Sequence, residues 1–287
     1  MLYRSTFQLL RFHFSFFLMP VFLFAVSQVK VVDWQKVLFS FLVLHLLVYP
    51  ASNGYNSYMD RDNTPIGGLA KPMQPTRQLF RISVLMDVLA VILSLFINYV
   101  FALGILFYIL ASRTYSYRRI RLKKYPLPGF ITVFIFQGAA IFFSVYYACS
   151  ANADVAVPAT ACLISSLLIG ALYPLTQIYQ HEADKADGVT TISYLLGTKG
   201  SFVFSGLQFL TATLLLYFYF SDKDEMKNFF LFLGYTFPVV LFFCYWMFKV
   251  WRNNSEANFK NSLIMNIVAM FCTACYFASL IYIRHFE

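Results

Sequence analysis

Long apolar segments alternate with short polar stretches along the whole chain. Each apolar segment is long enough to cross roughly 30 Å of hydrocarbon as an α-helix. The pattern predicts an all-α polytopic membrane protein with nine transmembrane helices. The predicted spans are 8–28, 35–56, 79–98, 99–117, 127–149, 155–180, 199–220, 228–250 and 262–284. The longest polar stretches are too short for a soluble domain, so residues 1–287 are expected to form a single transmembrane domain.

Two of the polar stretches repeat one another. The segment YPASNGYNSYMDRD at 49–62 returns 124 positions later as YPLTQIYQHEADKAD at 173–187. Positions i, i+3 and i+7 lie on one face of a helix, so each copy would present two amides and one aspartate on the same side. The two sets are Asn53, Asn56 and Asp60 in the first copy, and Gln177, Gln180 and Asp184 in the second.

The placement of basic residues predicts the topology. Cytoplasmic loops of membrane proteins carry an excess of Lys and Arg. With the N-terminus inside, most of the 22 basic residues fall on the inner side, and the outer side keeps only Lys30, Lys36, Lys223, Lys227 and Arg284. The chain is therefore expected in the cell (inner) membrane, with a cytoplasmic N-terminus and an outer C-terminus.

The same topology relates the two copies of the repeat. They follow the second and sixth spans, and because the number of helices between these spans is even, both copies emerge on the inner face. The repeat is then parallel, with its pseudo-axis along the membrane normal. The expected halves are about 1–120 and 121–250, each with four helices, and the ninth helix is appended.

Composition agrees with a membrane protein. The chain is 60% hydrophobic and only 12% charged, whereas a soluble domain carries about 25% charged residues. The formal net charge of +9 could suggest a nucleic-acid partner. The bases lie in short loops between apolar segments, however, so topology explains them and no nucleic acid is expected. The five cysteines fall in or beside apolar segments, which argues against disulfides and zinc.

Acidic residues gather in the two repeated stretches, against the basic tendency of inner loops. Carboxylates at the inner mouth of a bundle are costly unless they are paired or bound to metal. Oxygen donors without a nearby histidine pair suit a hard cation, and Mg²⁺ prefers one or two carboxylates plus phosphate oxygens. Neighbouring bases would complete a diphosphate clamp. The alternative is a set of solvated loop charges. The acids are Asp60, Asp62, Glu182, Asp184 and Asp187, and the bases include Arg61, Lys71, Lys185 and those in the run 118–124.

These motifs resemble those of the UbiA-type intramembrane prenyltransferases, which have nine transmembrane helices and Asp-rich motifs after the second and sixth. The family's first motif is Asn-x-x-x-Asp-x-x-x-Asp. Asn56 and Asp60 match it, Thr64 stands at the third position, and Asp62 is the nearest carboxylate. A third family signature appears as Tyr115-Ser116, Leu122-Lys123 and Pro126-Leu127-Pro128-Gly129.

The second motif of the family is Asp-x-x-x-Asp, usually followed by Gly-x-x-Thr and Leu-Gly. The matching residues here are Asp184, Gly188, Thr191 and Leu196-Gly197, with Glu182 as a common intervening acid. Gln180 replaces the first aspartate. A neutral amide there should weaken one metal, with Asp184 carrying that ion and Glu182 or Asp187 compensating. The resemblance covers the whole chain.

The resemblance implies Mg²⁺-dependent transfer of a prenyl group from an isoprenyl diphosphate to a small, lipophilic or aromatic acceptor of the quinone-precursor type within the bilayer. The implied catalytic residues are Asp60, Asp184 and Lys123. The expected metal ligands are Asn56, Asp60, Asp62, Glu182, Asp184 and Asp187. The expected substrate-binding residues are Asn53, Asn56, Arg61, Lys71, Tyr115, Ser116, Gln177, Gln180 and Lys185.

Other interpretations stay open at this point. A transporter or channel could use a parallel repeat around an ion pathway, although its charges would usually lie near the bilayer midplane. A family member without catalytic activity would also explain the departures at Gln180 and Thr64. Asp87, inside the third span, is either functional or paired with Arg81 or Arg113. His181, inside the second copy, is expected to be structural.

Overall fold

The computed structural model describes residues 2–152 and 156–287, and the regular elements in this part of the chain are helical. Its β-pairing is limited to isolated bridges between Val32 and Ser150 and between Ile66 and Leu69. Within the same residues, nine helical stretches are long and apolar enough to cross a membrane. The prediction of an all-α protein with nine spans is therefore confirmed.

The first four spans contain several irregular turns. The first span is broken into short pieces after Leu10, and the second contains a π-helical turn. The helices of this half are α1 (Arg4–Leu10), α2 (Phe12–Ser15), η1 (Phe16–Leu18), α3 (Met19–Gln28), α4 (Trp34–Leu42), η2 (Val43–Val48), α5 (Tyr49–Asp60), α6 (Arg77–Leu95) and α7 (Tyr99–Ser116).

The remaining five spans include a second π-helical turn, in the fifth span, and a short helix, α11, that lies outside the spans. The helices are η3 (Leu122–Lys124), α8 (Pro126–Val133), η4 (Phe134–Ala139), α9 (Ala140–Cys149), α10 (Ala159–Leu172), η5 (Pro174–Thr176), α11 (His181–Ala186), α12 (Ile192–Ser221), α13 (Met226–Arg252), η6 (Asn254–Glu256) and α14 (Phe259–His285).

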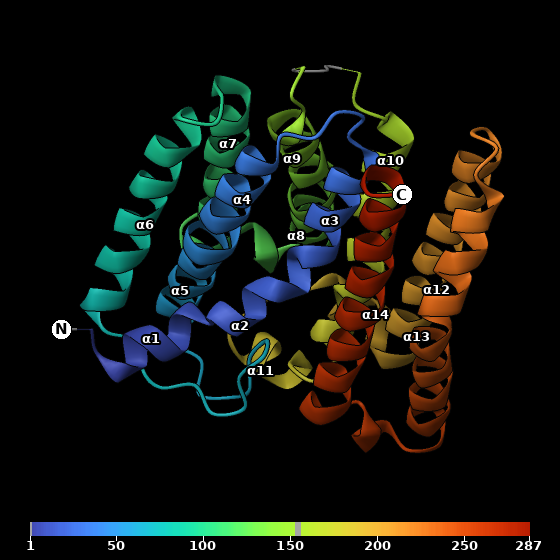
Figure 1. The fold of residues 1–287 in the computed structure, drawn as a ribbon. Helices are drawn as coiled ribbons and strands as arrows, with labels where there is room; N and C mark the ends of the chain where they lie inside the picture. Colours follow the sequence, from blue (N-terminus) through green and yellow to red (C-terminus); the bar gives the residue numbers. More distant parts are fainter. Residues whose placement is uncertain (1, 153–155) are drawn as a thin grey trace.

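The two repeated stretches lie at the same end of the bundle. In Figure 1, the N-terminus, α1, α2 and α11 lie at the lower end, where α5 also ends, and the C-terminus lies near the upper end. The ninth span, α14, packs against both α3 and α13. The first span therefore contacts the last, and elements from both halves of the sequence surround the interior at the lower end.

The sixth and seventh spans differ from their predicted limits. The sixth was expected at 155–180, but α10 ends at Leu172, and its predicted first residue, 155, lies outside the described residues. The seventh was expected from 199, but α12 begins at Ile192. The helix is interrupted at Gly197, which has a φ of 68° and a ψ of 172°. A short helical segment, 192–196, therefore precedes the break, and the long apolar part of the span follows it.

Aromatic contacts and close helix approaches hold the interior together. The ring of Phe24 stacks on Phe277, with centroids 4.5 Å apart, and meets the edge of Phe142 at 5.0 Å. Helices η4 and α10 approach so closely that a Cβ on Gly138 would lie 2.4 Å from the Cα of Ser166. Only glycine fits at that crossing.

The buried Asp87 has a partner within the membrane. The Arg113 guanidinium donates to the Asp87 carboxylate and lies 3.9 Å from the centre of the Tyr55 ring. Asp87 lies on the third span, Arg113 on the fourth and Tyr55 on the second, so these contacts join the three spans. Removing either member of the buried ion pair would leave an uncompensated charge. Of the two interpretations of Asp87, pairing with Arg113 is confirmed.

Candidate active site

A polar cavity of about 260 Å³ opens between the two copies of the repeated motif. Its walls come from α5, α7, α8, η4 and α10, from the broken first span, and from the loops at the lower end of the bundle. The polar side chains on its walls include Arg11, Ser52, Asn53, Asn56, Asp60, Asp62, Tyr115, Ser116, Lys123, Gln137, Tyr173, Gln177, Gln180 and Asp184.

The first copy of the motif is one continuous helix, α5. Asn53, Asn56 and Asp60 fall at the predicted i, i+3 and i+7 positions, and all three line the cavity. The amide of Asn56 donates to Ser116 Oγ over 2.9 Å, which joins this helix to the end of α7. The next residue, Arg61, ends α5 in the left-handed conformation at a φ of 57°.

Asp60 is neutralised by two bases from the loop after α7. Its carboxylate forms an ion pair with Arg121, at 3.3 Å, and a short one with Lys123. The Asp60 side chain is only 4% exposed, so these charges lie in a region of weak screening. Arg118 also donates to the backbone carbonyls of Met59 and Asp60, which have no intrahelical partner at this helix end. The loop is thereby fixed against the first motif.

The second copy does not continue its span as a helix. After α10 ends, a 3₁₀ turn covers Pro174–Thr176, and α11 begins only at His181. Gln177, Gln180 and Asp184 nevertheless all line the cavity. The amide of Gln180 donates to the carbonyl of Pro65 over 3.0 Å, which joins this copy to the loop after the first motif.

Asp184 contrasts with Asp60 in its charge partners. Its Oδ2 atom is buried and has no hydrogen-bond partner among the described residues. Burial, together with the charges of Asp60 and Asp62, raises the pKa of Asp184 to about 7, although Lys123 and Arg121 oppose this. Burial and the charge of Asp60 also raise the pKa of Asp62. The cavity thus holds acidic oxygens that a cation would stabilise.

The carboxylates alone do not form a metal cage. Across residues 2–152 and 156–287, no three His, Cys, Asp or Glu side chains come together closely enough to bind an ion by themselves. Mg²⁺ usually takes one or two carboxylates and completes its shell with water and phosphate oxygens. Asp184, with its unpartnered oxygen, and Asp62 fit such an ion if the substrate supplies the remaining ligands.

Five of the predicted site residues do not line the cavity. Asp187 lies beside it and pairs with Arg121 and, at 3.6 Å, with Arg118. Burial by itself would raise the pKa of Asp187, but the charges of these two bases outweigh it and lower that pKa. Asp187 therefore orients the arginine that also holds Asp60. The other four residues have exposed side chains: Arg61, Lys71, Glu182 and Lys185.

Sequence analysis missed Arg11 as a cavity residue. This arginine is 5% exposed, breaks the first span at a φ of 48°, and lines the cavity. Its guanidinium donates to the carbonyls of Gly67, at 3.0 Å, and Asn53, at 3.3 Å. It forms none of the ion pairs found in the described part of the chain. The signal in the sequence was a base inside an apolar segment, which we read only as a marker of topology.

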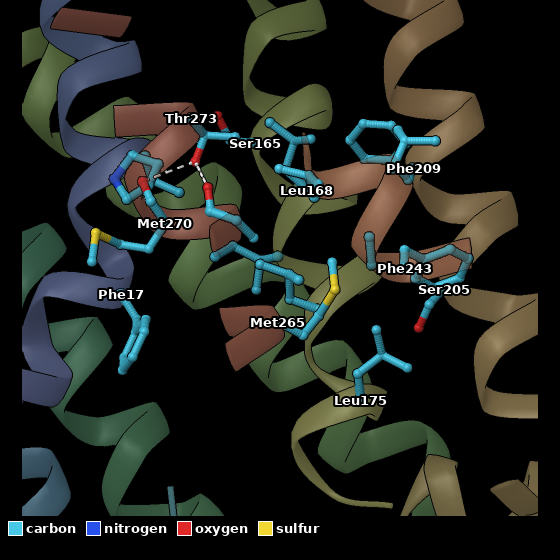
Figure 2. A pocket seen from close by; sticks show the side chains of 18 of the residues that line it. Phe17, Ser165, Leu168, Leu175, Ser205, Phe209, Phe243, Met265, Met270 and Thr273 are labelled. Atoms are coloured by element: carbon cyan, nitrogen blue, oxygen red, sulfur yellow. Dashed lines mark hydrogen bonds between the residues drawn. The ribbon is translucent and has the colours of Figure 1, made fainter. Parts of the chain in front are cut away.

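A second, apolar cavity of about 230 Å³ adjoins the polar one. It lies among α3, α10, α12, α13 and α14, and it shares Phe17, Ile169 and Leu172 with the polar cavity. Figure 2 shows Phe17 and Met270 on one side of it and Phe209 and Phe243 on the other. The polar atoms of one cavity and the apolar walls of the other would suit a ligand with a charged head and a hydrocarbon tail.

Comparison with known proteins gives one family. The UbiA prenyltransferase family matches residues 16–278. No curated protein matches the chain by sequence.

Several solved structures share the fold. A UbiA homologue from Archaeoglobus fulgidus, bound to DMAPP and Mg²⁺, is 17% identical with a TM-score of 0.69, and the match covers 97% of this chain and 99% of that one. An apo UbiA homologue from Aeropyrum pernix K1 is 16% identical with a TM-score of 0.68, covering 93% and 97%. A digeranylgeranylglyceryl phosphate synthase is 19% identical with a TM-score of 0.62, covering 97% and 98%. At these identities the likeness shows the fold alone.

Proposed function

The chain belongs to the UbiA prenyltransferase family, and on that premise we propose that it transfers a prenyl group from an isoprenyl diphosphate to a small acceptor within the membrane. The proposed acceptor is an aromatic molecule of the quinone-precursor type. The observation that carries the proposal is one polar cavity that holds Asp60 and Asp184 from both motif copies and adjoins an apolar cavity. The proposed location is the cell membrane, with this cavity on the cytoplasmic side.

Mg²⁺ is the proposed cofactor, and relatives with this fold are described with Mg²⁺ bound together with DMAPP or GPP. Asn56, Asp60, Asp62 and Asp184 would hold it, because all four line the cavity and Asp184 has a buried oxygen with no hydrogen-bond partner within residues 2–152 and 156–287. Bound Mg²⁺ would neutralise the diphosphate and make it a better leaving group. The positions of Glu182 and Asp187 outside the cavity give less support to a direct ligand role for them.

The bases around the cavity would bind the diphosphate oxygens. Lys123 and Arg11 line the cavity, and Arg121 pairs with the same carboxylate, Asp60, as Lys123. Charge-assisted hydrogen bonds to phosphate are the strong class of hydrogen bond. Because Asp60 and Asp187 fix the loop that carries Lys123 and Arg121, these donors would need little rearrangement as negative charge develops on the leaving group.

The reaction then follows from the surroundings of the two substrates. The allylic C–O bond breaks, and the diphosphate leaves with the bonding electrons. The walls near the donor carry the rings of Tyr49, Tyr108, Tyr115 and Tyr173, whose electron-rich faces favour a neighbouring cation. A carbon of the acceptor ring forms the new C–C bond, and the ring then releases a proton. The apolar cavity would hold the hydrocarbon chain of the donor away from water.

The experiment is prenyl transfer by the purified protein in lipid nanodiscs. The protein is incubated with Mg²⁺, a radiolabelled isoprenyl diphosphate and a panel of aromatic acceptors, and both diphosphate release and labelled product are measured. We expect release that requires an acceptor and Mg²⁺ and that is lost in Asp60→Asn and Asp184→Asn. Absence of release with every donor and acceptor, by a protein that still binds the donor, would contradict the proposal and favour an inactive member of the family.

A further inference from the structure

The helix that carries Asp184 is short and is not continuous with the span before it. Helix α11 has six residues, and the break after α10 separates it from the sixth span. An isolated helix of this length has little stability in water. Its position must therefore be set by contacts with other elements. Two are the Gln180 bond to the Pro65 carbonyl and the ion pair of Asp187 with Arg121.

A third contact is a chain of hydrogen bonds that starts at His181, the first residue of α11. His181 Nε2 lies 2.8 Å from Ser193 Oγ, and Ser193 Oγ lies 2.9 Å from Ser201 Oγ. Both serines are fully buried. The His181 ring also meets the Tyr194 ring edge-on, with centroids 5.6 Å apart. None of these side chains lines either cavity.

The hydrogen bonds that start at His181 end at the interruption in α12. Ser201 Oγ donates to the carbonyl of Gly197 over 2.8 Å, and it lies 3.2 Å from the carbonyl of Ser193. Gly197 has a positive φ, a conformation that other residues rarely adopt. The hydroxyl of Ser201 therefore joins the two parts of α12 across the kink, and Ser193 connects this hydroxyl to His181.

The number of hydrogens that each hydroxyl can donate sets the direction of these hydrogen bonds. Each serine hydroxyl has a single hydrogen to donate. If Ser201 donates to the Gly197 carbonyl, Ser193 must donate to Ser201, and His181 must donate from Nε2 to Ser193. This direction satisfies every member of the chain, and it requires the His181 tautomer with hydrogen on Nε2. Such a connected chain fixes both elements more firmly than separate contacts would.

We propose that His181 is a positioning residue that holds the Asp184 carboxylate at the cavity by fixing α11 to the kink of α12 through Ser193 and Ser201. The inference rests on the proposed function, because the position of α11 matters for activity only if Asp184 binds the cation. It gives the structural role expected of His181 a specific purpose. The histidine acts on the site through α11, three residues from Asp184, and lines neither cavity.

The test compares His181→Phe, which keeps a ring but cannot donate, with His181→Gln, whose amide nitrogen reaches the same place. Ser193→Ala breaks the same chain with a smaller change. The matched control is Thr213→Val, which removes a hydroxyl bonded to the carbonyl four residues earlier on the same helix, far from α11. Two quantities are measured: amide hydrogen exchange of residues 181–186 without metal, and the Mg²⁺ concentration that gives half-maximal diphosphate release.

We expect His181→Phe and Ser193→Ala to speed exchange in 181–186 and to raise the half-maximal Mg²⁺ concentration, because each leaves a buried polar group without its hydrogen bond. The expected change in each quantity is about tenfold, which corresponds to roughly 1.4 kcal/mol. His181→Gln and Thr213→Val should resemble the wild type. The double variant His181→Phe/Ser193→Ala should be no worse than either single one.

Three outcomes decide the inference. Unchanged exchange and unchanged Mg²⁺ dependence in His181→Phe would overturn it. An equal change in Thr213→Val would also overturn it, because general loosening of α12 would then be the cause. If the wild type releases no diphosphate while the exchange results are as expected, the proposed function fails and the anchoring of α11 by His181 stands.

Discussion

The two copies of the repeated motif share a sequence pattern but fold differently. The first is a continuous helix from Tyr49 to Asp60, whereas the second unwinds at Pro174. A proline lacks the backbone N–H and crowds the carbonyl four residues earlier. Before Pro50 the chain forms a π-helical turn, Val43–Val48, which changes the spacing where that crowding would occur. Helix α10 has no such turn, and the second copy leaves the helix at its proline.

The copies also differ in how their aspartates are neutralised. Asp60 pairs with Lys123 and Arg121, while Asp184 has a buried oxygen that finds no hydrogen-bond partner in the described part of the chain. We infer a division of roles, in which the first copy positions bases for the diphosphate and the second provides the open ligand for the cation. A duplicated pattern therefore need not give two equivalent half-sites. The following predictions test this difference, from the largest expected effect to the smallest.

Asp184→Asn should cause the largest loss. The substitution keeps the shape of the side chain but removes a carboxylate oxygen that has no hydrogen-bond partner among the described residues. We expect diphosphate release at saturating Mg²⁺ to fall by about 10²–10³-fold, the size typical of removing one preorganised electrostatic group. Single-turnover release of labelled diphosphate measures it. Glu182→Gln removes a nearby exposed charge and should have a much smaller effect; equal losses would contradict the assignment of Asp184.

Lys123→Met should come second. Methionine fills similar space without the charge, so the diphosphate loses a donor and Asp60 keeps only Arg121. We expect kcat/KM for the donor to fall by about 10²-fold, because charge-assisted contacts to phosphate are strong. The matched control is Lys124→Met, an exposed neighbour that forms no ion pair within the described residues. If both variants lose activity equally, the loop needs only its overall charge and the first copy has no special role.

Leu172→Trp addresses the residue just before the second copy. It lies on the walls of both cavities, whereas Val48, the equivalent position before the first copy, is buried in the core. An indole there should narrow the passage to the apolar cavity. We expect kcat/KM to fall about tenfold more for a C20 donor than for a C5 donor, in line with the few kcal/mol that apolar pocket contacts contribute. Leu163→Trp, on an exposed part of α10, should leave the ratio of the two donors unchanged.

Much of the fold was predictable because hydropathy in a membrane protein reflects a strong constraint on each span. The nine spans and the same-end placement of both motifs follow from segment length and from the even number of helices between the copies. The break after α10 was not predictable from the motif, because Tyr-Pro occurs in both copies. The difference comes from the π-helical turn before Pro50, which has no sequence signal that we could identify.

The site was only partly predictable for a related reason. Residues on one helix face, such as Asn53, Asn56 and Asp60, share a direction that spacing alone gives. Which base neutralises which acid depends on loops that meet in space, as Lys123 and Asp60 do across the polar cavity. Arg11 was missed because a single base in the first apolar segment has the same appearance whether it marks topology or lines a cavity.

Gln180→Asp should have the smallest effect and the opposite sign. It restores an aspartate where the family pattern has one, in the copy whose Asp184 forms none of the ion pairs found in the described part of the chain. The added charge should lower the half-maximal Mg²⁺ concentration by about threefold, since the lost hydrogen bond to the Pro65 carbonyl offsets part of the electrostatic gain. Asn56→Asp adds the same charge to the first copy. Its carboxylate could accept a hydrogen bond from the Ser116 hydroxyl, to which the Asn56 amide donates in the wild type. Because Lys123 and Arg121 already neutralise the first copy, the added carboxylate there should compete for these bases, with no gain in Mg²⁺ affinity. Equal gains from the two variants would mean that the copies bind the cation alike, and the contrast in their ion pairs would then have no part in the chemistry.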